Sequence, residues 1–139
     1  MDLVLMLFLV AVLIVGLLLI AIVAYTHRSG GALNKDDYQS RWLGIETRLD
    51  KNNSSTYQIV ILDADKLLDK ALRERRFRGE TMGARMKSAG GDWKNADHVW
   101  GAHKIRNRIA HETDVQLNYE IAARSLAAYK QALKDLGAI

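Results

Sequence analysis

The stretch that decides the fold is residues 55–76, which reads STYQIVILDADKLLDKALRERR. Apolar side chains return in it every three or four residues, a period that places them on one face of an α-helix. The face consists of Tyr57, Val60, Ile61, Ala64, Leu67, Leu68 and Ala71. Ser54 or Ser55 can begin this helix, and we expect it to end near Arg76. Because such a helix is stable only when its apolar face is covered, the stretch predicts a core built from packed helices.

Other stretches with the same period extend this core on both sides. We expect long helices over residues 35–51, 93–111 and 118–136, and a short one over 81–87. Asn34 is placed to cap the first helix, and Gly137 to end the last. The predicted core positions of the first and last helices are Tyr38, Trp42, Ile45, Leu49, Tyr119, Ala122, Leu126, Tyr129, Leu133 and Leu136. Four long helices with short connections predict an all-α domain over residues 35–139, an up-and-down four-helix bundle.

The N-terminal segment has a different composition from the rest of the chain. Residues 3–25 carry no charge, and 23 of the first 25 residues are apolar. As an α-helix this segment would cross a hydrocarbon core of roughly 30 Å. The alternative is a cleaved signal peptide. A signal peptide needs a basic start and a shorter apolar core, whereas the only charged residue before this apolar segment is the acid Asp2. We therefore predict a transmembrane anchor over residues 1–25, with Tyr25 at the interface, and a flexible linker over 26–34.

The charges around this anchor predict its orientation. His27, Arg28, Lys35 and Arg41 follow the span, whereas no Lys or Arg precedes it. Because positive residues flank the cytoplasmic side, we expect the C-terminal domain in the cytoplasm, at the inner membrane of a bacterial cell. The 114 residues after Tyr25 are too few for a two-domain enzyme, and without cysteine they hold neither a disulfide nor a cysteine zinc site.

One arginine stands out in the helix predicted over residues 93–111. On a helical wheel Val99, Ala102, Ile105 and Ile109 form an apolar arc, and Arg106 falls inside it. Burying an unpaired guanidinium is costly. Arg106 should therefore pair with a buried acid or carbonyl, extend past the core to solvent, or line a cleft.

A polar flank lies beside this arc on the same helix. His103, Asn107 and His111 recur four residues apart, with Trp100 next to them. The ordinary explanation of this pattern is a polar edge of the bundle or a helix end. His103 and His111 are two turns apart, which is too far to chelate one ion without ligands from elsewhere. We therefore expect no metal site here, and nothing in the sequence indicates a cofactor.

The segment HKIRNRIAHE, residues 103–112, resembles the RNxxAH segment of the HEPN superfamily, whose members are small α-helical domains. The resemblance covers about residues 38–137, and Arg106, Asn107 and His111 match its arginine, polar neighbour and histidine. It implies metal-independent RNA cleavage in active members, where an arginine stabilises phosphate charge and a histidine moves a proton. It also implies a homodimer in which two motifs face one cleft, although other members only bind. The membrane anchor departs from the usual soluble form.

A basic stretch lies between the second and third long helices. It consists of Arg73, Arg75, Arg76, Arg78, Arg85 and Lys87, opposed only by Glu74 and Glu80. Three explanations stay open: RNA phosphates, the anionic inner leaflet of the membrane, or a solvated helix end where cations suit the dipole.

The sequence leaves two main functions to distinguish. One is a membrane-anchored endoribonuclease with Arg106, Asn107 and His111 as catalytic residues and His103 and Trp100 as auxiliary residues. The other is a catalytically silent HEPN-like module that holds a protein partner or a second copy at the membrane. An unrelated small helical protein is the third alternative. An open cleft shared by Arg106 and His111 would favour the enzyme, whereas Arg106 sealed against a buried acid would favour the module.

Overall fold

The computed structural model describes residues 2–28 and 30–139, with the side chains of residues 25–28 left out of the description. Within these ranges every regular element is an α-helix. The chain divides into two compact units, Met1–Gly30 and Gly31–Ile139. The predicted all-α class is therefore confirmed for the part of the chain that is described.

The first unit is one long apolar helix, α1 (Leu3–Arg28). Its segment Leu3–Ala24 has 22 residues and is long and apolar enough to cross a membrane. The side chains of this segment are exposed almost throughout, so no protein core covers them. The helix extends to Arg28, into the region predicted as a linker. The interfacial role predicted for Tyr25 and the flanking charges of His27 and Arg28 concern side chains outside the described residues.

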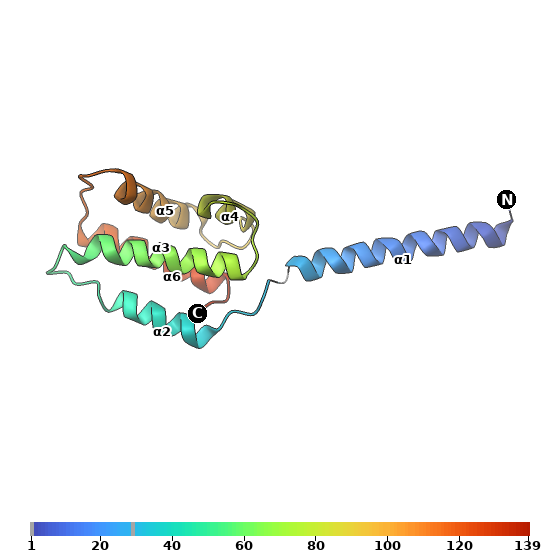
Figure 1. Cartoon of the computed structure of the whole chain (residues 1–139), viewed down its shortest axis with the longest axis horizontal. Coiled ribbons are helices and arrows are strands. Elements are labelled where there is room, and N and C mark those ends of the chain that lie inside the picture. The colour runs from blue at the N-terminus through green and yellow to red at the C-terminus, as the bar shows by residue number, and fades with distance from the viewer. Residues whose placement is uncertain (1, 29) are drawn as a thin grey trace. The chain divides into compact units, whose positions relative to one another are not determined.

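The second unit is a helical bundle built around one central helix. Its elements are α2 (Lys35–Glu46), α3 (Thr56–Glu74), α4 (Met82–Ser88), α5 (Ala96–His111) and α6 (Tyr119–Asp135). Helix α3 packs against all four others, and α5 also packs against α6. Figure 1 shows that the chain reverses direction between α2 and α3, and again between α5 and α6.

The core of this unit lies along α3, as its sequence predicts. Val60, Ile61, Ala64 and Leu68 are fully excluded from solvent, and the other predicted positions of this face are buried too. On α6 the small residues Ser125, Ala128 and Ala132 are also buried. Small side chains let α6 approach its neighbours closely. The predicted seam of the last helix is confirmed except for Tyr119, which is 36% exposed.

Side-chain caps fix most helix starts. Asn34, Thr81, Asn95 and Asn118 each accept a hydrogen bond from a backbone N–H of the first turn. The cap at Asn95 makes α5 begin at Ala96, so the predicted start at residue 93 is wrong. Trp93 lies instead in the preceding loop, where its indole N–H donates to the carbonyl of Met86 at 3.0 Å.

The predicted end of the first bundle helix is also wrong. Helix α2 ends at Glu46, not at residue 51. The Thr47 hydroxyl donates to the carbonyl of Leu43 at 2.8 Å. The backbone N–H groups of Arg48 and Leu49 then donate to carbonyls three residues back instead of four. The apolar period continues through Leu49, which packs on the core from outside the helix, so periodicity alone overestimates the helix length.

Helix α3 ends in a motif that normally contains glycine. Arg76 has φ 60°, in the left-handed region. The N–H of Phe77 donates to the carbonyl of Leu72, and that of Arg76 to the carbonyl of Arg73. This is the Schellman arrangement, which Gly137 also forms after α6 with φ 71°.

Arg76→Gly should stabilise the second unit by about 0.5–1 kcal/mol. Left-handed backbone costs an L-residue about 1–2 kcal/mol, and the extra freedom of glycine in the unfolded chain offsets part of this gain. Urea unfolding followed by tryptophan fluorescence measures it, because Trp42, Trp93 and Trp100 all lie in this unit. Arg78→Gly is the matched control, because Arg78 has no positive φ to relieve. A variant Arg76→Gly less stable than the wild-type chain would contradict this account.

Candidate active site

The candidate site is organised around Asp65, a carboxylate on α3 that is only 2% exposed. Its Oδ1 accepts hydrogen bonds from His103 Nδ1 at 2.8 Å and from the hydroxyl of Tyr129 at 2.9 Å. Its Oδ2 lies 3.0 Å from Nε of Arg106. Three helices thus meet at one acid, since His103 and Arg106 come from α5 and Tyr129 from α6.

Arg106 has one end in the core and the other toward solvent. Its buried Nε forms an ion pair with Asp65, although the N–H does not point along the contact and makes no aligned hydrogen bond. Its Nη1 donates to Oδ1 of Asn107 at 3.0 Å. The side chain stays 32% exposed. Of the alternatives left open for Arg106, the structure shows pairing with a buried acid, and the arginine is not sealed.

Tyr129 is fully buried and serves as a fixed donor to Asp65. Burial raises the pKa of the Tyr129 phenol far above its ordinary value of 10, and the neighbouring carboxylate of Asp65 raises that pKa further. The phenol therefore keeps its proton at all physiological pH values, and the bond to Asp65 does not titrate away.

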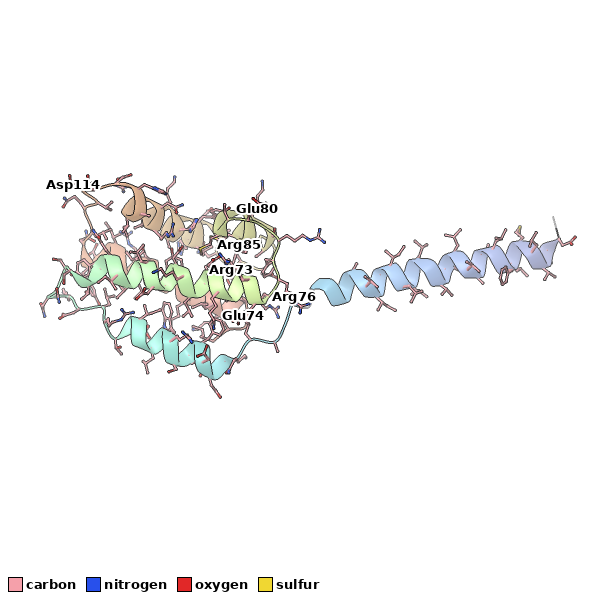
Figure 2. The ribbon with its side chains drawn as sticks, viewed as in Figure 1. Arg73, Glu74, Arg76, Glu80, Arg85 and Asp114 are labelled. Carbon is pink, nitrogen blue, oxygen red and sulfur yellow. The ribbon has the colours of Figure 1, made fainter. Side chains whose placement is uncertain are left out.

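A polar cleft of about 500 Å³ opens beside this network, between α3, α4 and α5. Its lining residues are Asp69, Arg73, Glu80, Thr81, Met82, Gly83, Arg85, Trp100, His103, Arg106 and Asn107. Three arginines and two acids give the lining a formal charge of +1 with His103 neutral. Figure 2 shows the labelled Arg73, Arg85 and Glu80 gathered at this end of the bundle.

Arg85 is a structural member of this lining. Its Nε and Nη2 donate to Oδ1 of Asp69, at 2.8 and 2.6 Å, and its Nη1 donates to the carbonyl of Gly79 at 2.7 Å. Gly79 has φ 146°, and a Cβ there would lie 2.6 Å from the backbone nitrogen of Arg85, so only glycine fits. Arg73 also pairs with Asp69, through Nε at 2.9 Å, but its side chain is 64% exposed.

The cleft gathers some of the residues predicted from sequence and leaves others out. Arg106, Asn107, His103 and Trp100 line it, together with Arg73 and Arg85 from the basic stretch. His111 does not line it. It lies exposed in the last turn of α5, about 140° around the helix from Arg106, and its ring has no hydrogen-bond partner among the described residues.

The remaining basic residues do not line the cleft either. Arg76, Arg78 and Lys87 are exposed and Arg75 is half-buried. Figure 2 places Arg76 at the end of α3, beside Glu74. The lipid and RNA explanations for these four residues stay predictions.

Asp65 is the residue that sequence reasoning missed. A signal for it was present: Asp65 is four residues after Ile61 and three before Leu68, which puts an acid on the apolar face of α3. The same test that singled out Arg106 on α5 would have found it. Pairing the two misplaced charges across helices would then have predicted their contact.

A second hollow lies along α5 and α6 and differs in character. It has a volume of about 720 Å³ and is lined mainly by apolar and small residues, among them Val99, Ala102, Ile105, Ile121 and Ala128. Lys94, Arg124 and Asp135 stand around it, so its rim carries both signs of charge. It contains none of the residues in the predicted catalytic motif.

Comparison of the chain with protein-family models, with curated proteins and with solved structures gives no match. The residues of the motif and the geometry of the cleft therefore have to indicate the function of the chain.

Replacing Asp65 should destabilise the bundle far more than replacing a surface acid of the same helix. Asp65→Ala leaves Arg106, His103 and Tyr129 without their shared acceptor, and breaking a buried pair costs about 3–5 kcal/mol. The control Asp63→Ala breaks only the exposed pair with Arg48, at a cost of about 1 kcal/mol or less. Urea unfolding of the full chain in detergent micelles measures both. Equal stability of the two variants would show that the buried network contributes no more than the exposed pair.

Proposed function

We propose that this chain is a HEPN-like domain held at the cytoplasmic face of the inner membrane, and that its polar cleft binds and cleaves single-stranded RNA without a metal ion. One observation carries the proposal. The arginine and asparagine of the motif line an accessible cleft together with a histidine and an exposed tryptophan. Asp65 also holds Arg106 in place from the core side. A group that stabilises the negative charge developing on a phosphate in the transition state needs such a fixed position.

Two arginines on the cleft have donors to spare for phosphate oxygens. Arg106 uses Nε and Nη1 inside the protein, and its Nη2 has no partner among the described residues. Arg73 uses only Nε, on Asp69. Charge-assisted bonds from guanidinium groups to phosphate oxygens are among the stronger contacts that a protein makes. Trp100, which is 38% exposed, offers a face on which an RNA base can stack.

His111 fits the proposal only through a second copy of the chain. Within one chain it faces away from Arg106, so it cannot act on a phosphate held in the same cleft. The homodimer implied by the HEPN resemblance would supply His111 from a partner. The apolar hollow on α5 and α6 is a candidate surface for that contact, because a rim with both charge signs can complement itself about a twofold axis.

The catalytically silent module is the second candidate, and a specific observation favours it. Arg106 forms an ion pair with a buried acid while His111 lies outside the cleft. In this reading the Asp65 network only stabilises the bundle, and the domain binds RNA or a protein partner at the membrane without cleaving anything.

Helix α1 serves as the anchor in this proposal. A fusion of alkaline phosphatase to the C-terminus should be inactive in bacterial cells, and a fusion of a fluorescent protein to the same end should be bright. This follows because Lys35 and Arg41 stand just after the span. An active phosphatase fusion would place the domain outside the cytoplasm and exclude contact with cytoplasmic RNA.

The RNA proposal predicts a defined effect of the cleft arginines. The full chain in detergent micelles with EDTA should bind and cleave an unstructured RNA oligonucleotide. Arg73→Ala and Arg106→Ala should each weaken binding about tenfold, which corresponds to one lost charge-assisted bond. The matched control Arg48→Ala removes an exposed arginine that lines neither hollow and should leave binding unchanged. Fluorescence anisotropy with a labelled RNA measures this.

Two results of this experiment would change the conclusion. Binding that depends on Arg73 and Arg106 without any cleavage would favour the silent module. Absence of binding, or equal loss in the Arg48→Ala control, would exclude the cleft as an RNA site.

A further inference from the structure

We infer that His103, rather than His111 of the same chain, is the group that accepts the proton of the attacking RNA 2′-hydroxyl. This inference rests on the proposed RNA function and deepens it. His103 comes three residues before Arg106 on α5, and both side chains line the cleft and contact Asp65.

The bond to Asp65 fixes which ring nitrogen is available. A carboxylate oxygen can only accept, so Nδ1 of His103 donates to Asp65 across their 2.8 Å contact. In a neutral imidazole the other nitrogen, Nε2, then carries a lone pair and acts as an acceptor. The hydroxyl of Tyr129 also donates to Asp65 and orients its carboxylate. The carboxylate in turn orients the imidazole ring of His103.

The position of Nε2 is unusual for a structural histidine. The side chain of His103 is 10% exposed, and Nε2 makes no hydrogen bond with the described part of the chain. It is directed toward α4, where a Cβ added to Gly83 would lie 3.9 Å from it. Gly83 also lines the cleft, so the free lone pair borders the space in which a ligand would lie. Nε2 is not among the buried atoms of the described residues that lack a partner, so it is accessible from the cleft and not sealed in the core.

The neighbours of the ring suit a reacting phosphate. Trp100 packs edge-on against His103, with ring centroids 6.1 Å apart and an interplanar angle of 78°, which restricts rotation of the imidazole. Asn107 is one turn further along α5 and is held by Arg106. A phosphate bound by Arg106 Nη2 would therefore lie beside the histidine, within the reach of adjacent turns of one helix.

The proposed cleavage is a transesterification at the phosphorus next to the 2′-hydroxyl. Nε2 of His103 takes the proton of the 2′-hydroxyl, and the 2′-oxygen forms a bond to the adjacent phosphorus. The bond from phosphorus to the 5′-oxygen breaks, and that oxygen takes a proton from water. The imidazolium returns its proton to solvent, leaving a 2′,3′-cyclic phosphate and a 5′-hydroxyl.

His103→Asn separates two roles of this histidine, the hydrogen bond from Nδ1 to Asp65 and the acceptance of a proton by Nε2. The amide of asparagine can replace Nδ1–H as the donor to Asp65, whereas nothing replaces Nε2. In full-length protein in micelles with EDTA, RNA cleavage should fall about 100-fold or more in this variant. Affinity for an uncleavable 2′-O-methyl RNA should stay within about threefold, and tryptophan fluorescence should show an unchanged fold. The matched control Lys104→Asn, at an exposed position of α5 that lines neither hollow, should keep its cleavage rate within about fivefold. Full activity of His103→Asn, or an equal loss in Lys104→Asn, would overturn the inference.

A second measurement does not depend on cleavage. It distinguishes a failure of the role proposed for His103 from a failure of the proposal that the cleft binds RNA. With ¹⁵N-labelled histidine, the Nε2 resonance of His103 should shift when 2′-O-methyl RNA is added. RNA that binds without shifting His103 would refute the role of His103 and leave the cleft as an RNA site. RNA that does not bind at all would refute both.

Discussion

The bundle depends on a carboxylate placed where carboxylates are seldom found. Asp65 lies on the central helix α3, next to the fully buried Ala64, and it is nearly closed to solvent. A charge in such a place requires hydrogen bonds and a counter-charge. Helix α5 supplies His103 and Arg106, and helix α6 supplies Tyr129. These three contacts restrict how α5 and α6 can rotate or slide on α3, because a shift of one residue on either helix would leave the acid unpartnered.

The same constraint explains why the cleft has the residues it has. Once Arg106 reaches inward to Asp65, the residues next to it on the helix, Trp100, His103 and Asn107, point to the gap between α5 and α4. A second acid on α3, Asp69, fixes the opposite wall by holding Arg85 and Arg73. Arg85 in turn holds the carbonyl of Gly79, which ties the loop before α4 to the bundle. Two acids one turn apart on one helix therefore organise both walls.

Helix positions and core faces follow from the sequence because they depend on local periodicity and on capping residues. The faces of α3 and α6 were predictable from spacing, and the caps at Asn34 and Asn118 and the stop at Gly137 act within a few residues. The end of α2 was not predictable, since Leu49 continues the apolar period after the helix has stopped. The start of α5 was missed for a related reason, because Trp93 is apolar and buried but belongs to a loop.

The sequence by itself determined an apolar N-terminal helix, a set of amphipathic helices after it, and an arginine on the apolar face of one of them. Only the tertiary structure decided that this arginine pairs with Asp65, which histidine shares that acid, and which arginines line the cleft. The reason is that Asp65, His103 and Tyr129 are up to 64 residues apart, and their contacts depend on how three helices rotate about their axes as the core packs. Sequence spacing placed Arg106 and His111 in one motif, yet helical geometry separates them, whereas it brings together Arg106 and the less conspicuous His103 at one buried acid.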